Sequence, residues 1–153
     1  MSIKIIPFKP AYAPIFKELN QNWIEQYFTI EPLDLYLLEN CQEHIINKGG
    51  YIFFAKKEDT ITGCFALLRV DNVTYELGKM AVSPEFQGLK IGQKLLSFAV
   101  DFAKEKSWKT LILYSSTKLG SALHIYKKFG FKEVAIEPNV EYARSDIKMQ
   151  LTL

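Results

Sequence analysis

Residues 80–96 read Met80-Ala81-Val82-Ser83-Pro84-Glu85-Phe86-Gln87-Gly88-Leu89-Lys90-Ile91-Gly92-Gln93-Lys94-Leu95-Leu96, and they predict a strand, a glycine-bearing loop and an amphipathic helix in direct succession. The first backbone N–H groups of a helix have no partners within the helix, and the helix dipole places partial positive charge beside them. The two glycines allow the backbone to approach a ligand closely. This segment therefore predicts an anion site, with a phosphate as the favoured ligand.

The two common nucleotide-binding patterns do not fit this loop. The Walker pattern G-x-x-x-x-G-K-[ST] fails because Gly88 and Gly92 are four residues apart and Gln93 follows them. The dinucleotide pattern G-x-G-x-x-G does not occur in the segment. Both nucleotide-binding hypotheses are therefore rejected.

The residues before this segment predict a strand, two helices and an antiparallel hairpin. Apolar residues at helical spacing indicate the helices, and the Gly49-Gly50 pair ends the second one. Turn-forming residues between two apolar runs indicate the hairpin. The expected elements are a strand over 3–8, helices over 11–27 and 33–46, and strands over 51–56 and 61–70.

The residues after residue 74 alternate between strands and helices. The helix that follows the loop has an apolar stripe at Ile91, Leu95, Ala99, Phe102 and Ala103. The expected elements are strands over 75–82, 110–114, 131–136 and 144–153, and a last helix that ends at Gly130. This order predicts an α/β fold with a mixed, mostly antiparallel sheet of about seven strands, flanked by about four helices.

Composition limits the classes of protein to which the chain can belong. Its 153 residues are 48% hydrophobic, which predicts one domain over residues 1–153. The net charge of +2 argues against a nucleic-acid partner, and the apolar runs are too short to cross a membrane. Two cysteines and the absence of an apolar signal segment at the start lead us to expect a cytoplasmic protein.

Three motifs resemble the GNAT superfamily of N-acetyltransferases. Gln87-Gly88-Leu89-Lys90-Ile91-Gly92 is similar to its coenzyme-A loop, [Gln/Arg]-x-x-Gly-x-[Gly/Ala], with Lys90 in place of the middle glycine. Ile61-Thr62-Gly63 resembles the family's "ivG" turn, and Ile125-Tyr126-Lys127-Lys128-Phe129-Gly130-Phe131 resembles its "lYeklGF" run. The resemblance implies a single-domain N-acetyltransferase that uses acetyl-CoA, with its sheet split near Val82 to admit this co-substrate.

The resemblance also implies which residues contact coenzyme A. The backbone of Met80, Ala81 and Val82 would pair with the pantetheine arm as an added strand does. Lys90 or Lys94 could approach the remaining phosphate, or could be plain solvent-exposed residues. Ser116 stands near the position where some relatives carry an asparagine. The amides implied to hold the pyrophosphate belong to Gln87, Gly88, Leu89, Lys90, Ile91, Gly92 and Gln93.

Acetyl transfer to an amine needs a neutral nucleophile, and at pH 7 deprotonating an alkylammonium costs roughly 4.6 kcal/mol. Glu76 lies on the strand before the loop, where several GNAT enzymes place a general base, and burial would raise its pKa. Tyr126 matches the tyrosine that protonates the leaving thiolate in the family. Catalysis by positioning alone, without a base, is the alternative.

In the family, the first two helices and the last hairpin form the acceptor pocket. The candidate substrate-binding residues are Tyr27, Phe28, Glu31, Tyr142 and Arg144. Glu31 could pair with an ammonium group, or Arg144 with an α-carboxylate, so small amines and amino acids are both possible acceptors.

Two further functions compete with that of a small-molecule N-acetyltransferase. The chain could be a non-catalytic acyl-CoA sensor, because Lys90 replaces a motif glycine and the asparagine is missing. It could also acetylate a protein N-terminus or lysine. A homodimer is common in the family. Cys41 and His44 are three residues apart on an expected helix, but we interpret them as packing residues and expect no metal.

Overall fold

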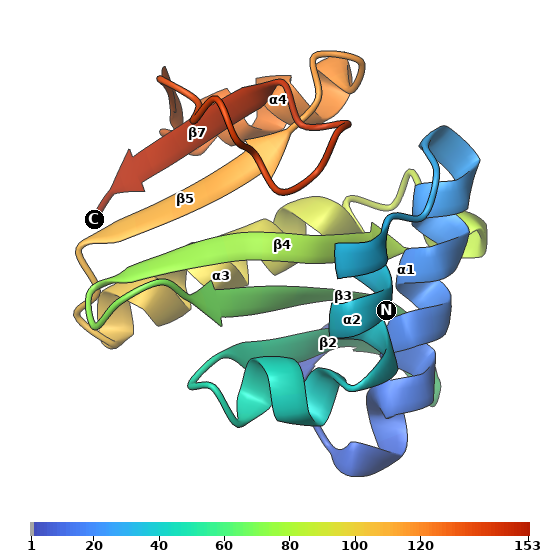
Figure 1. The fold of residues 1–153 in the computed structure, drawn as a ribbon. Coiled ribbons are helices and arrows are strands. Elements are labelled where there is room, and N and C mark those ends of the chain that lie inside the picture. The colour runs from blue at the N-terminus through green and yellow to red at the C-terminus, as the bar shows by residue number, and fades with distance from the viewer. Residues whose placement is uncertain (1) are drawn as a thin grey trace.

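The computed structural model describes residues 2–153 and contains a seven-stranded sheet in the order β1-β2-β3-β4-β5-β7-β6 (Figure 1). Neighbouring strands are antiparallel, except that β4 and β5 are parallel. The prediction of a mixed, mostly antiparallel sheet is confirmed. The strands are β1 (Ile3–Pro7), β2 (Tyr51–Lys57), β3 (Thr60–Arg69), β4 (Thr74–Val82), β5 (Thr110–Ser115), β6 (Lys132–Val134) and β7 (Ile147–Thr152).

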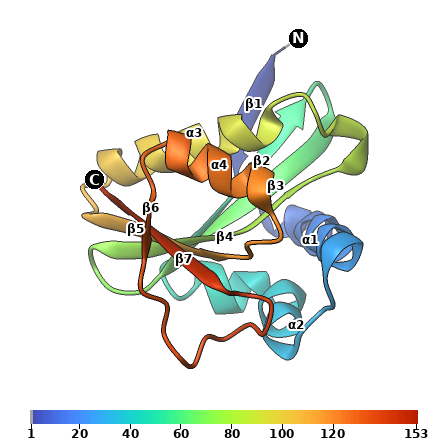
Figure 2. The same ribbon diagram turned by 90° about the horizontal axis from the view of Figure 1, so that it is seen from above.

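Four α-helices cover the two faces of this sheet (Figure 2). One face lies under α1 (Ala13–Tyr27) and α2 (Pro32–Glu39), and the other under α3 (Ile91–Glu105) and α4 (Gly120–Lys128). In the described part of the chain, no helix combines the length and the apolar character that crossing a membrane requires.

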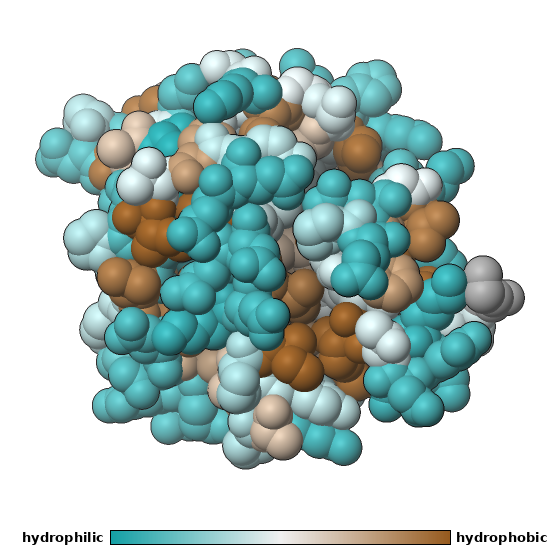
Figure 3. All heavy atoms as spheres, turned by 90° about the vertical axis from the view of Figure 1, so that its right-hand side faces the viewer, coloured by the Kyte–Doolittle hydropathy of each residue, from teal (hydrophilic) through white to brown (hydrophobic). Residues whose placement is uncertain are grey.

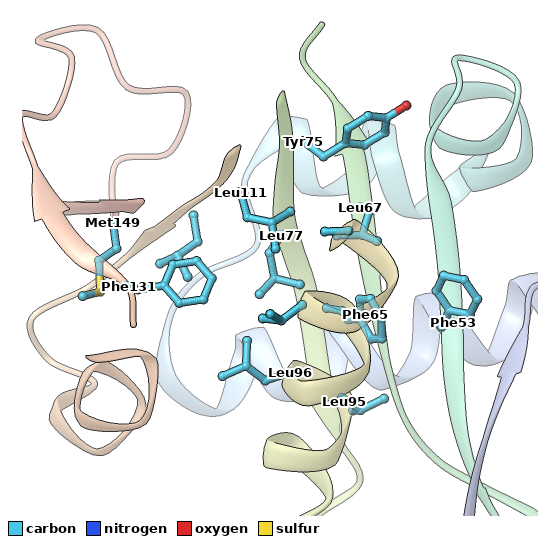
Figure 4. Close-up of a cluster of buried hydrophobic side chains, with 14 of the residues drawn as sticks. Phe53, Phe65, Leu67, Tyr75, Leu77, Leu95, Leu96, Leu111, Phe131 and Met149 are labelled. Carbon is cyan, nitrogen blue, oxygen red and sulfur yellow. The ribbon is translucent and has the colours of Figure 1, made fainter. Parts of the chain in front are cut away.

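Each face has its own hydrophobic core. On the α3 face, Leu95 and Leu96 pack against side chains of the sheet such as Phe65 and Leu77 (Figure 4). On the α1 face, Phe16 and Ile24 belong to a second buried cluster, together with alternate residues of β2 and β3. Because both faces are covered, the central strands are apolar at nearly every position rather than at every second one.

The sheet divides between β4 and β5. These strands pair at only three positions, from Thr74↔Thr110 to Glu76↔Ile112, and then separate (Figure 1). The predicted split of the sheet is confirmed. A β-bulge lies in the separated part of β4, since Lys79 and Met80 together stand opposite the single residue Phe65 of β3.

The predicted bounds of one helix and two strands are wrong. The helix expected over 33–46 ends at Glu39, because Asn40 leaves the helical conformation (φ −134°, ψ 55°), and a separate π-helical turn spans Gln42–Ile46. Asparagine readily leaves helices because its side chain competes for backbone hydrogen bonds. The closing strands, expected over 131–136 and 144–153, are the shorter β6 and β7.

A buried ion network explains why β7 begins late. Arg144 lies before the strand and donates two hydrogen bonds to the fully buried carboxylate of Asp34 on α2, at 2.7 and 2.9 Å. Lys79 of β4 donates a third hydrogen bond to Asp34 at 2.6 Å, and the backbone N–H of Glu31 donates a fourth at 2.8 Å. The network joins α2, β4 and the segment before β7.

Replacing Asp34 by asparagine tests the energetic weight of this network. Burial opposes ionisation of Asp34, but its bonds with Arg144 and Lys79 outweigh burial and lower its pKa to about 2. Its contribution to stability is therefore complete above about pH 4 and is lost as the pH falls towards 2. We expect Asp34→Asn to lower the unfolding free energy at pH 7 by about 3 kcal/mol. The decrease in unfolding free energy between pH 4 and 2 should be smaller in this variant than in the original protein, as measured by urea denaturation.

The matched control is Asp101→Asn, which removes a carboxylate from the exposed side of α3. This change should alter the unfolding free energy by no more than about 0.5 kcal/mol. Equal losses in the two variants would contradict the role of the network.

Candidate active site

The loop before α3 holds a row of backbone amides that have no partner. Within residues 2–153, the six N–H groups of residues 88–93 make no hydrogen bond, whereas Lys94 N–H bonds to the carbonyl of Lys90. A 3₁₀ turn over Pro84–Phe86 leads into this row, and the side chain of Gln87 donates to the carbonyl of Val82 at 3.2 Å. The free amides lie at the positive end of the α3 dipole.

Left-handed backbone conformations give the loop its shape. Gly88 has φ +85°, and Lys90, the N-cap of α3, has φ 61° and ψ 23°. Glycine adopts this conformation without cost, whereas another L-residue loses about 1 kcal/mol. Lys90 therefore has the backbone conformation that a glycine favours, and its departure from the family motif leaves the path of the chain intact.

The split in the sheet opens into a cavity of about 450 Å³. The cavity is lined by β4 from Glu76, the last residue paired with β5, to Val82, and it reaches the loop at Gln87 and Gly92. The split opens towards the face seen in Figure 3, where hydrophobic atoms show between hydrophilic flanks.

Most of the predicted site residues lie around this one cavity. It is lined by Tyr27, Phe28, Glu76, Met80, Ala81, Val82, Gln87, Gly92, Ser116, Tyr126, Tyr142 and Arg144. Six of the predicted residues do not contribute to its lining, namely Glu31, Gly88, Leu89, Lys90, Ile91 and Gln93. For the five loop residues among them, the free backbone N–H is the feature that matters, and the side chain of Ile91 is buried in the core.

Glu76 is a partly buried carboxyl group with no hydrogen-bond or ion-pair partner in the described chain. Burial raises its pKa to about 7, and the negative charge of Glu141 adds to this shift. Glu76 also lines a second cavity, of about 280 Å³, together with Glu137, Glu141 and Tyr142. Its carboxyl group can therefore exchange a proton near neutral pH, and it borders both cavities.

Tyr126 lines the main cavity from α4. Its ring meets Phe131 edge-on with centroids 6.0 Å apart, and burial raises the pKa of its hydroxyl group. The hydroxyl forms no hydrogen bond within residues 2–153. Tyr126 therefore remains protonated at neutral pH and has a proton free to donate.

The geometry does not support the expected pairing of Glu31 with an ammonium group of the acceptor, or of Arg144 with its α-carboxylate. Arg144 donates to Glu31 at 3.2 Å as well as to Asp34, and Glu31 accepts a further bond from the Ala143 N–H at 2.9 Å. Each residue is engaged within the protein, so neither charge is free for an ammonium group or an α-carboxylate.

Sequence reasoning missed Asp34 and Lys79. A signal for Asp34 was present, because Glu31-Pro32-Leu33-Asp34 has an acidic N-cap, a proline at the first helical position and an acid two residues later, and it forms a capping box. No local signal existed for Lys79, whose partner lies 45 residues away.

The surroundings of the cysteines, and of the Cys41 and His44 pair considered above as metal ligands, do not favour reactivity. Cys64 is fully buried, and burial raises the pKa of its thiol to about 12. The described residues contain no group of three or more histidine, cysteine or acidic side chains that could hold a metal ion. His44 instead stacks on Tyr36, with ring centroids 3.7 Å apart.

Comparison with known proteins identifies the family. A family model for the acetyltransferase (GNAT) domain matches residues 48–133. Probable N-acetyltransferase 14 of Xenopus tropicalis is 37% identical over 76 residues, which cover 49% of this chain and 37% of that protein. The match thus spans well under two thirds of that relative.

Solved structures agree over the whole chain. An acetyltransferase of the GNAT family from Staphylococcus aureus Mu50 has a TM-score of 0.86 and 26% identity, covering 99% of each chain. The PaiA N-acetyltransferase of Thermoplasma acidophilum, solved in complex with coenzyme A, shares the fold with a TM-score of 0.79 and 21% identity over 100% of both chains. Since the family model covers more than half of the residues, the chain belongs to the GNAT acetyltransferase family.

Proposed function

We propose that this protein transfers the acetyl group of acetyl-CoA to a primary amine of a small molecule, which attacks the thioester directly. One observation carries this proposal. The row of free amides at residues 88–93 meets the cavity at Gly92, the unpaired edge of β4 borders the same cavity, and Glu76 and Tyr126 line it. A diphosphate, an extended amide-bearing arm and a thioester can follow one another along this path.

The residues present fit coenzyme A. Amides 88–93 and the dipole of α3 suit its diphosphate, and a Cβ added at Gly92 would meet no atom within 4 Å, so open space lies there. Lys94 is exposed on the first turn of α3, within the same positive region. Farther along, β4 has no neighbouring strand on this side between Met80 and Val82, which suits the amides of the pantetheine arm.

Substitution of Gly92 tests the diphosphate site. Gly92→Glu places a carboxylate in the open space beside the free amides, where it occupies the anion site and repels phosphate. We expect coenzyme A to bind at least about tenfold more weakly, a loss of about 1.4 kcal/mol, measured by isothermal titration calorimetry.

Ser97→Glu is the matched control, because it adds the same charge to an exposed position of the same helix. Its affinity for coenzyme A should stay within about twofold of the original, as expected for an exposed charge beyond the first turn of the helix. Equal weakening in both variants would indicate that the loop does not hold the diphosphate.

The side chains in the cavity can move the protons that the reaction requires. Glu76 accepts the ammonium proton, directly or through water, and N–H groups of β4 near Val82 can donate to the thioester oxygen as the amine nitrogen bonds to carbon. Tyr126 donates its proton to sulfur as the carbon–sulfur bond breaks. No covalent intermediate with the protein is needed, in keeping with the inert setting of Cys64.

The pH profile tests the role of Glu76. Because the carboxyl group must be ionised to accept a proton, we expect kcat/KM to fall tenfold per pH unit below about pH 7, where burial places the pKa of Glu76. Glu76→Gln should remove this limb and lower the rate about 10²-fold or more. Two acceptor amines of different pKa should give the same limb; a limb that follows the amine instead would rule out Glu76 as the base.

The charges around the cavities favour an amine that carries a second positive group. Asp34 and Glu31 neutralise Lys79 and Arg144, whereas Glu141 has no ion-pair partner within the described residues. In the second cavity, Glu137 is engaged by Lys148 and by the hydroxyl of Tyr114. The uncompensated charges near Glu76 are therefore negative, which suits a cation and opposes an α-carboxylate.

A comparison of 1,5-diaminopentane with lysine tests this preference, because the two acceptors differ only in one carboxylate. Release of free coenzyme A thiol should show a kcat/KM at least about tenfold higher for the diamine, consistent with one unfavourable charge contact of about 1.4 kcal/mol. Glu141→Gln should narrow the difference. Equal kcat/KM values for the two acceptors would contradict the preference for a second positive group. Binding of coenzyme A without turnover of any amine would instead favour a non-catalytic acyl-CoA sensor.

A further inference from the structure

Lys79 is a buried cation in an uncommon backbone conformation. It has φ 52°, in the left-handed region, and its side chain is only 6% exposed. Both features cost free energy, because a residue with a Cβ is strained there and an ammonium group loses hydration when it is buried. Such a residue persists where the surrounding structure holds it in place, and its position then invites a functional explanation.

Two segments far away in the sequence hold the ammonium group of Lys79. It donates to Asp34 of α2 at 2.6 Å and to the hydroxyl of Tyr142 at 2.9 Å. It also lies 4.6 Å from the centre of the Tyr142 ring. These contacts fix one end of a flexible side chain from two sides.

The bulge in β4 turns Lys79 to the same face as Glu76. In a regular strand, residues 76 and 79 would point to opposite faces, because side chains alternate. Here Leu77 lies in the core on the α3 face, whereas Ala81 lies in the core on the α1 face, so the extra residue of the bulge reverses the alternation. Glu76 and Lys79 consequently line the same cavity.

We propose that Lys79 is a positioning residue for the proposed reaction: its ammonium group, held by Asp34 and Tyr142, keeps the neighbouring Glu76 carboxyl group able to ionise inside the cavity. The proposal rests on the proposed function through the role of Glu76 as the base. Burial and nearby carboxylates favour the protonated form of Glu76, and Lys79 opposes them from the same strand.

The other groups that act on Glu76 come from the segment before β7 and from the sheet. Glu141 and Glu137 favour its protonated form, and Lys148 of β7 favours the ionised form. The hydroxyl groups of Tyr142 and Tyr114 border the same cavities and stay neutral at pH 7, because their pKa values are raised by burial. Lys148 and Lys79 are each paired with one carboxylate, Glu137 and Asp34, and of the two cations only Lys79 stands on the same strand as Glu76 and lines the main cavity with it.

The test compares Lys79→Gln with Lys79→Arg. The glutamine removes the charge and keeps a donor for Asp34, whereas the arginine keeps the charge on an unbranched side chain with the same backbone strain. The readout is the ¹³C NMR titration of the Glu76 carboxyl carbon in protein labelled at glutamate, with Glu76→Gln used to assign the signal. We expect the midpoint to rise by roughly half a unit to one unit in Lys79→Gln, and to stay at the original value in Lys79→Arg.

The acid limb of kcat/KM should shift in the same direction and by the same amount. An unchanged midpoint in Lys79→Gln, or equal shifts in the two variants, would overturn the proposal. If Lys79→Gln does not fold, Lys79→Met, which keeps an unbranched side chain without the charge, should again raise the midpoint, and Asp34 stays bound by Arg144 in that variant.

The titration separates this inference from the proposed function. It is made on the free protein and needs no acceptor, so a shifted midpoint supports the action of Lys79 on Glu76 even if no amine is acetylated. Turnover that is absent with every amine would overturn the proposed function, and the electrostatic link would remain as measured.

Discussion

The site depends on the early end of pairing between β4 and β5. Three residue pairs hold the two strands together, and beyond Glu76 the backbone of β4 has no neighbour on that side. Buried backbone groups without partners are costly, so such an edge persists only where water or a ligand can reach it. The cavity and the exposure of Glu76 to two cavities both follow from this separation.

The two ends of the cavity are built by different means. At the α3 end, the binding groups are main-chain amides, whose positions depend on backbone conformation and tolerate Lys90 in place of glycine. At the other end, side chains set the properties: aromatic rings of α1 and the segment before β7 form the walls, and paired ions fix the charge. The first end suits a constant ligand, and the second can vary through few substitutions.

The sequence was informative where the interactions are local. The strand, loop and helix over 80–96 were predictable because glycine spacing and apolar periodicity act within a few residues. The helix break at Asn40 depends on a weak preference that the surrounding structure enforces. Lys79 and Arg144 could not be placed, since each meets Asp34 across 45 or 110 residues and no local pattern reports such contacts.

The same separations bear on how the protein forms during synthesis. Residues 74–105 are contiguous and include β4, the loop and α3, so the anion-binding end can assemble while the ribosome is still at work. Asp34, in contrast, cannot bind Arg144 until the ribosome has added a further 110 residues. Contacts of such long range form late because the intervening chain must first be ordered. The anion-binding end of the site can thus form before the buried ion network at its other end.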